Sequence, residues 1–350
     1  MKAYVLEGIN NLVYKEIGKP VLKSGEVLVK VKAAGICGSD IPRIFTTGAH
    51  VHPIVPGHEF SGEVVETGSD SMKKWVGKRV GIFPLIPCME CECCKSKQYE
   101  MCRNYSYLGS RCDGGFAEYV SVPEWNLISL PEGVSYREAA MLEPLSVAAH
   151  AVRRAVKTSD KKAYVAVWGL GTIGLASIVM LKALGFENII GIGKKKLQKE
   201  KALELGVSEA NYVDSGNENV VEKVKKITGG RGVDVALECV GRSEVANGCV
   251  EIAAPYKTVM LVGNPASDIC FAKETYWKIL RNQLTVFGTW NSSFTHDKED
   301  DWNFVLSVLA KNDVKAEKLI SHVFPFDKLE NGLFVMKDKS EDYIKIMTEL

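Results

Sequence analysis

Short apolar runs separated by Gly and Pro fill the first stretch of the chain, from residue 1 to about residue 144. Val, Ile, Phe and Tyr are frequent in these runs, as they are in strands. The pattern predicts strands over residues 26–31, 60–67, 79–83 and 117–122. We therefore expect a compact β-rich domain in this stretch.

The rhythm changes between residues 145 and 289, where short apolar runs alternate with helical patterns. An apolar run over 163–168 leads through Gly169 into a helical pattern that ends at Gly185. A second run over 188–192 precedes a lysine-rich helix that stops near Gly206. Further apolar runs follow at 233–237, 258–262 and 284–287. This alternation predicts βαβ units and a parallel sheet with helices on both faces.

The last stretch, residues 290–350, is too short to be an independent domain of typical size. It contains two amphipathic helix candidates, over 301–310 and 327–336, and we expect it to pack on the first stretch. The fold class is thus α/β with two domains. The predicted boundaries place residues 1–145 and 290–350 in one domain and residues 146–289 in the other.

Charge and composition narrow the class of protein. Lys and Arg number 44 against 43 Asp and Glu, so the net charge is +1 and a nucleic-acid partner is not expected. No run approaches 18 apolar residues, which predicts no membrane span. The chain has ten cysteines and no secretory signal at its start, which favours a cytoplasmic protein that uses thiols for metal binding instead of disulfides.

Four cysteines follow the spacing C-x2-C-x2-C-x7-C and predict a structural zinc site; they are Cys88, Cys91, Cys94 and Cys102. Zn²⁺ favours four thiolates in a closed tetrahedron, and two-residue gaps let successive sulfurs converge from one loop. Cys93 interrupts the pattern and is predicted to point away. Two alternatives remain for this segment: unrelated thiols on a loop, or an iron–sulfur cluster.

A second metal site is predicted from residues that lie far apart in the sequence. Cys37 stands in Gly-Ile-Cys-Gly-Ser-Asp, His58 and Glu59 follow Gly57, and Glu143 precedes a proline. Cys, His and Glu form three-ligand zinc sites with one position open for water or substrate, as Lewis-acid chemistry requires. The sequence leaves open which glutamate coordinates. Each residue also has an ordinary structural interpretation, such as a buried small thiol.

A glycine turn after the run 163–168 predicts a dinucleotide site. The segment Gly169-Leu170-Gly171-Thr172-Ile173-Gly174 contains G-x-G-x-x-G between a strand and a helix. The first glycine makes the tight turn, the second admits a pyrophosphate, and the third lets helix and strand pack closely. Free N–H groups at the start of the helix would bind the phosphates.

The residues after the second strand of this unit predict the cofactor preference. An acidic residue is expected there for NAD, but the chain reads Gly193-Lys194-Lys195-Lys196. Lysines would attract a 2′-phosphate, and a lysine-rich helix start opposes the helix dipole unless an anion is bound. We therefore favour NADP(H) over NAD(H). The alternative is a solvated helix start.

Taken in order, these motifs resemble the zinc-dependent medium-chain dehydrogenases along nearly the whole chain. The resemblance implies a GroES-like catalytic domain and a Rossmann domain. It is strongest to the polyol branch, because Glu143 stands where liver-type alcohol dehydrogenases carry a cysteine ligand. Segments 38–45, 48–50, 109–119 and 278–290 are similar to those of enzymes that oxidise galactitol 1-phosphate to tagatose 6-phosphate.

The resemblance also implies roles for further residues. Ser39 would relay a proton, since Pro42 stands where several relatives have a relay histidine. Val240 and Gly263 complete the implied cofactor site. A phosphorylated substrate would need cationic partners, and the matching segments offer Arg43, His50, His52 and Arg111.

The expected partners are a small-molecule substrate and a nicotinamide cofactor, and the expected assembly is a homodimer or homotetramer. Rival functions are a dehydrogenase of non-phosphorylated polyols or secondary alcohols, a zinc-ribbon module and an inactive scaffold. For Arg43 and Arg111, surface or interdomain ion pairs remain an alternative to substrate binding.

Overall fold

A computed structural model describes residues 1–311 and 316–350. The chain folds as two units, Met1–Glu143 with Ser293–Leu350, and Pro144–Ser292. Each unit is built on its own principal sheet.

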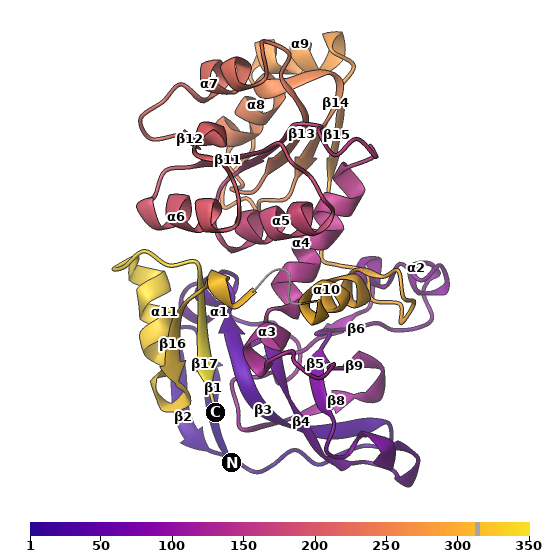
Figure 1. The fold of residues 1–350 in the computed structure, drawn as a ribbon. Coiled ribbons are helices and arrows are strands. Elements are labelled where there is room, and N and C mark those ends of the chain that lie inside the picture. Colours follow the sequence, from indigo (N-terminus) through magenta and orange to yellow (C-terminus); the bar gives the residue numbers. More distant parts are fainter. Residues whose placement is uncertain (312–315) are drawn as a thin grey trace. The chain divides into compact units, whose positions relative to one another are not determined.

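The first unit is centred on a seven-stranded sheet of order β16-β17-β3-β4-β5-β9, with β8 also paired to β3. The C-terminal strand β17 lies beside β3, so the last residues of the chain join a sheet built mainly from its first 130 residues (Figure 1). Most residues of β3 are buried. The strands of this seven-stranded sheet are β3 Glu26–Ile36, β4 Glu59–Thr67, β5 Arg79–Ile82, β8 Tyr119–Pro123, β9 Leu127–Ser129, β16 Ile320–Pro325 and β17 Lys345–Glu349.

Two small antiparallel pairs and several helices complete the first unit. The pairs are β1 Lys2–Gly8 with β2 Asn11–Glu16, and β6 Leu85–Ile86 with β7 Ser106–Tyr107. The helices are α1 Asp40–Phe45, α2 Glu92–Lys95, α3 Tyr136–Ala140, α10 Asp301–Ala310 and α11 Leu329–Asp338. Helix α4, Leu142–Ala155, begins at the end of this unit and continues into the next.

The second unit is a six-stranded parallel sheet of order β12-β11-β10-β13-β14-β15. Counted along the chain this order is 3-2-1-4-5-6, which is the Rossmann arrangement. The strands are β10 Val165–Trp168, β11 Ile189–Gly193, β12 Tyr212–Asp214, β13 Val233–Glu238, β14 Ala253–Leu261 and β15 Thr285–Gly288. The helices are α5 Thr172–Ala183, α6 Lys196–Glu204, α7 Val220–Ile227, α8 Ser243–Ile252 and α9 Lys273–Arg281.

The predicted α/β class and parallel sheet are confirmed. The sequence patterns missed β12, which has only three residues and so cannot show a periodicity. Helix α5 buries eight successive residues, Gly174–Leu181, against its surroundings. This burial explains why its sequence is apolar all round.

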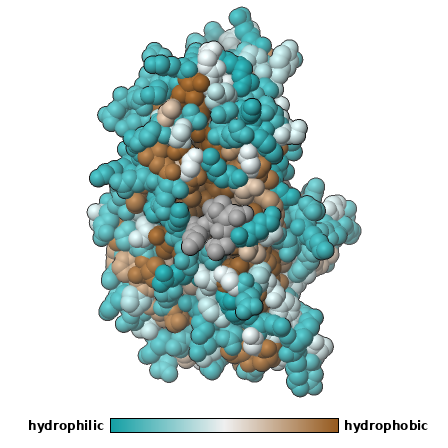
Figure 2. Space-filling model, viewed as in Figure 1, coloured by the Kyte–Doolittle hydropathy of each residue, from teal (hydrophilic) through white to brown (hydrophobic). Residues whose placement is uncertain are grey.

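The outer surface is mainly hydrophilic on the face shown in Figure 2, with scattered apolar patches. Among residues 1–311 and 316–350, no helix is long and apolar enough to cross a bilayer. All ten cysteines are free in this structure.

Candidate metal centres and cofactor site

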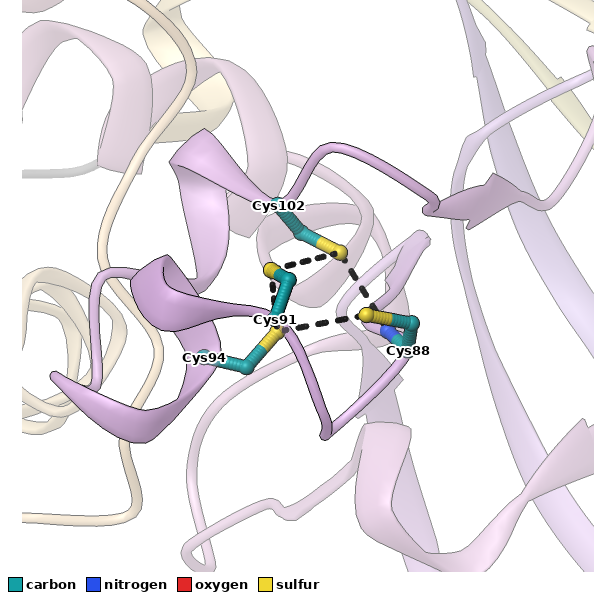
Figure 3. Close-up of side chains that lie close together, drawn as sticks. All are labelled: Cys88, Cys91, Cys94 and Cys102. Atoms are coloured by element: carbon teal, nitrogen blue, oxygen red, sulfur yellow. Dashed lines mark hydrogen bonds between the residues drawn. The ribbon is translucent and has the colours of Figure 1, made fainter.

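The four spaced cysteines converge in one lobe of the first unit. Cys91 directly precedes α2, Cys94 lies within it, Cys88 follows β6, and Cys102 follows a short 3₁₀ turn. Their sulfur atoms point toward one another (Figure 3). Sγ of Cys91 lies 3.5 Å from that of Cys94 and 4.0 Å from that of Cys102.

These separations suit a single tetrahedral ion. A Zn–S bond of about 2.3 Å implies sulfurs about 3.8 Å apart, and Sγ of Cys88 lies 3.9 Å from that of Cys94. A multi-iron cluster would need wider spacing between the thiolates. Backbone N–H groups of Arg103 and Cys94 lower the pKa of Cys91 to about 6, which favours the metal-binding thiolate. Cys93 is not part of the group.

A second group of metal-binding side chains forms where two strands of the main sheet end. Cys37 follows β3, and His58 precedes Glu59, the first residue of β4. Ligand atoms of Cys37, His58 and Glu59 lie within 4.8 Å of one another. Thiolate, imidazole and carboxylate are the donor set of a catalytic zinc site with an open position, so these residues fit the ion.

Asp40, the first residue of α1, supports this group, although the sequence reasoning gave it no role. Its buried carboxylate accepts a hydrogen bond from the Cys37 N–H at 3.0 Å and pairs with Arg43 at 2.6 Å. It lies 3.5 Å from Nδ1 of His58. Burial opposes a charged imidazole, but Asp40 and Cys37 outweigh it and raise the pKa of His58 well above its ordinary value.

Lys345 is a second residue that the sequence reasoning missed. This first residue of β17 contacts both carboxylate oxygens of Glu59, at 2.5 and 2.8 Å. No local motif marks it, because 286 residues separate the two partners. Only the pairing of β17 with β3 brings them together.

Glu143 lies close by but is not in the three-residue group. Its Oε1 accepts a hydrogen bond of 3.2 Å from the hydroxyl of Tyr107, and the ring of Tyr107 stands edge-on to that of His58. Burial raises the pKa of Glu143 to about 7. The charge of Glu59 adds to this increase, and His58 opposes it. Tyr107 is therefore a further neighbour of the site, and Glu59 is the glutamate that the geometry groups with Cys37 and His58.

The glycine turn of the second unit lies at the carboxyl edge of the parallel sheet, between β10 and α5. Gly169 adopts a φ of +105°, which favours glycine. A side chain at Gly174 would clash with the carbonyl oxygen of Gly169, whereas one at Gly171 would meet no atom within 4 Å. Gly171 therefore leaves its backbone open to a phosphate group, and the helix start beyond it fits a pyrophosphate.

Val240 and Gly263 lie beside this turn. A side chain at Gly169 would clash with Val240, and one at Gly263 would clash with the N–H of Gly241. The buried carboxylate of Glu238 accepts 2.8 Å hydrogen bonds from the N–H groups of both Val240 and Gly241. Glu238 thus shapes the loop after β13, a role that sequence reasoning missed.

The lysine run begins directly after β11. Gly193 is buried and ends the strand, Lys194 is exposed, and Lys195 immediately precedes α6. Asp214 pairs with Gly193 in the neighbouring strand β12, but its carboxylate is occupied by the N–H of Gly216 and the amide of Asn217, each at 2.9 Å. No acidic residue stands at the end of β11 itself.

A pocket of about 370 Å³ opens beside the Cys37 segment; its lining residues are Ser39, Arg43, Thr47, Gly48, Ala49 and His50. Ser39 makes no cap hydrogen bond to α1. Arg111 is not among the lining residues and stacks over the ring of Tyr105. His52 uses both ring nitrogens on the backbone, with the N–H of Ala49 at 3.2 Å and the carbonyl of Leu6 at 3.3 Å.

Comparison with known proteins agrees with this architecture. Residues 23–132 match the alcohol dehydrogenase GroES-like domain, and residues 172–310 match the zinc-binding dehydrogenase family. The galactitol 1-phosphate 5-dehydrogenase of Escherichia coli K12 is 35% identical over 310 residues, 88% of each chain. The sorbitol dehydrogenase of Halalkalibacterium halodurans is 33% identical, with 99% of this chain and 98% of that one covered.

Among solved structures, a putative zinc-binding dehydrogenase of Sinorhizobium meliloti bound to NADP superposes with a TM-score of 0.90. It is 28% identical, with 100% of this chain and 99% of that chain covered. The chain belongs to the zinc-containing medium-chain dehydrogenases. It is a zinc-dependent, NAD(P)-linked alcohol or polyol dehydrogenase that acts on a small-molecule substrate.

Proposed function

We propose that the substrate is a sugar alcohol phosphate, such as galactitol 1-phosphate, and that tagatose 6-phosphate is the product. The pocket beside Cys37 carries this proposal. Arg43 and His50 line it, and both can donate hydrogen bonds to a phosphate. Arg43 also pairs with Asp40, so its guanidinium is held at the pocket wall.

The catalytic roles follow from the residues around this pocket. We assign Cys37, His58 and Glu59 or Glu143 to a catalytic zinc ion, and the four-cysteine lobe to a structural one. Bound there, the catalytic ion would stabilise negative charge on the substrate oxygen. Ser39 lines the pocket with a hydroxyl not used for capping, and we assign it the transfer of the hydroxyl proton toward solvent. The nicotinamide, when bound, would accept the hydride from the carbinol carbon.

NADP(H) is the cofactor that we favour. Lys194 and Lys195 follow the strand at which an acid would bind the ribose of NAD, and Asp214 is occupied by its own turn. A 2′-phosphate would meet the cationic side chains of Lys194 and Lys195 here. We assign residues 169–174, Gly193, Val240 and Gly263 to the same cofactor.

A substrate panel tests the proposal. Galactitol 1-phosphate, galactitol, sorbitol and tagatose 6-phosphate are assayed with both cofactors, and zinc is counted in the same sample. We expect kcat/KM to fall at least about tenfold when the phosphate is removed, since a charge-assisted contact contributes about 1.5–3 kcal/mol. An unchanged kcat/KM would contradict a phosphate subsite. His50→Ala should lower kcat/KM for galactitol 1-phosphate but not for galactitol. The control Thr46→Ala lies outside the pocket lining and should lower neither value.

A non-phosphorylated polyol is the second candidate substrate. The likeness to a sorbitol dehydrogenase over 99% of this chain favours it. Equal rates with sorbitol and galactitol 1-phosphate would support this candidate over the first.

We also propose that the chain forms a homodimer or a larger homo-oligomer. Strand β15 ends the parallel sheet, and α9 near this end exposes Tyr276, Trp277 and Leu280 to 57, 48 and 52%. An open strand edge and exposed apolar side chains suit pairing with a second copy. Light scattering should give at least a dimer mass, and Trp277→Asp should lower it.

The thiol-rich, disulfide-free chain supports a reducing, cytoplasmic setting.

A further inference from the structure

The ion pair between Lys345 and Glu59 is fully enclosed at the candidate catalytic centre. The two side chains are only 3% and 1% exposed. The ammonium group of Lys345 contacts both oxygens of Glu59 and donates a third hydrogen bond, of 3.0 Å, to the carbonyl of Ile36. An ammonium group has three donors, so every one of them is used. Lys345 is therefore held in one position.

The geometry depends on three neighbouring strands. Lys345 begins β17 and Glu59 begins β4, while β3 lies between these two strands. Glu59 pairs directly with Gly35 of β3, and a side chain at Gly35 would clash with Oε2 of Glu59. The missing side chain leaves the space in which the carboxylate meets the ammonium group across β3.

Glu59 therefore has two cationic partners within reach. Its carboxylate belongs to the group with Cys37 and His58, yet both of its oxygens contact Lys345. A buried carboxylate that loses its only counter-ion is strongly destabilised and must find another cation. Without Lys345, a metal ion bound by Cys37 and His58 would be a cation that Glu59 can reach.

We propose that Lys345 is a positioning residue that competes with the metal ion for the oxygens of Glu59, so that Glu59 binds the metal through one oxygen only and one coordination position stays open. The inference rests on the proposed assignment of Cys37, His58 and Glu59 to the catalytic zinc. A single contact from Glu59 would leave the fourth position to the substrate oxygen. Lys345 would act through its contacts to Glu59.

The test compares Lys345→Met, Lys345→Arg, Glu59→Gln and the double variant Lys345→Met/Glu59→Gln as full-length proteins. Transfer of zinc to a chromogenic chelator is followed over time, and Co²⁺-substituted protein gives a visible spectrum that reports coordination. Zinc loss from the four-cysteine lobe is the internal control, assigned with Cys94→Ser. Thermal unfolding checks that each variant is folded.

We expect Lys345→Met to slow zinc loss from the catalytic site about tenfold, to alter the Co²⁺ spectrum and to lower kcat. Lys345→Arg should restore the wild-type spectrum. In the Glu59→Gln background, Lys345→Met should have no further effect on zinc loss, because Lys345 acts only through Glu59. Faster zinc loss in Lys345→Met, or an equal effect with and without Glu59, would overturn the inference. Wild-type protein that binds only the lobe zinc would instead refute the proposed function.

Discussion

Oδ1 of Asp40 lies 3.5 Å from Nδ1 of His58, and this buried contact joins the start of α1 to the residue before β4. The same carboxylate accepts the N–H of Cys37. Asp40 therefore orients two of the three grouped metal-binding residues at once. Carboxylates behind a metal-binding histidine fix its orientation and its tautomer.

Asp40→Asn should weaken the catalytic centre without removing a ligand. The amide keeps the shape but loses the charge beside His58 and Arg43, so we expect zinc affinity and kcat/KM to fall about 10- to 100-fold. Zinc content after dialysis against a chelator measures the first effect. Asp70→Asn is the matched control, since Asp70 forms an exposed pair with Lys73. Equal losses in both variants would argue against an orienting role for Asp40.

The zinc ligands of the four-cysteine lobe can be tested with a matched control, because a fifth cysteine, Cys93, lies within the same segment. Cys94→Ser should reduce the zinc content from about two ions to about one per chain and lower the melting temperature, since a closed zinc site stabilises its own loop. Cys93→Ser should keep both ions, because Cys93 is outside the group of four sulfurs. Loss of zinc in Cys93→Ser would show that the ligand set is different.

Short-range patterns were sufficient to predict the sheet of the second unit. The runs at 163–168, 188–192 and 233–237 became β10, β11 and β13, because parallel strands buried on both faces are continuously apolar. The C-x2-C-x2-C-x7-C spacing likewise gave the grouped sulfurs, since ligands from one loop converge by local geometry. Both signals lie within a few dozen residues of sequence.

Residues that support the catalytic group were not predictable in this way. Lys345 reaches Glu59 only after β17 joins β3, and Tyr107 meets Glu143 only in the folded unit. Asp40 had a weak local signal, as the fourth residue of Cys-Gly-Ser-Asp, but its carboxylate acts on His58 eighteen positions further along the chain. Single-sequence patterns carry no information on such pairings.

Of the two lysines Lys194 and Lys201, we expect only Lys194 to determine the cofactor preference. Lys194→Ala should raise KM for NADP(H) about tenfold or more and leave KM for NAD(H) unchanged, because one charge-assisted contact to the 2′-phosphate is lost. Lys201→Ala is the control, since Lys201 pairs with Glu204 in the last turn of α6. Initial rates with both cofactors measure the effect. A parallel rise in both KM values would contradict selection by Lys194.

The raised pKa of Glu143 predicts how the stability of the metal-free protein depends on pH. Its folded-state pKa is about 7, against an ordinary value of 4.5, so the folded state holds a proton that the unfolded chain releases. Stability should therefore fall as pH rises from 4.5 through 7. A shift of this size corresponds to at most about 3 kcal/mol.

Glu143→Gln removes this titration, so the melting temperature of the chelator-treated variant should exceed that of the wild type by more at pH 8 than at pH 5. Differential scanning calorimetry at four pH values measures the difference. Glu349→Gln is the control, because the Arg137 hydrogen bonds lower the pKa of Glu349 and its loss should act equally from pH 5 to pH 8. A pH-independent difference for Glu143→Gln would mean that the buried carboxyl is already ionised at pH 5, and that His58 outweighs its burial.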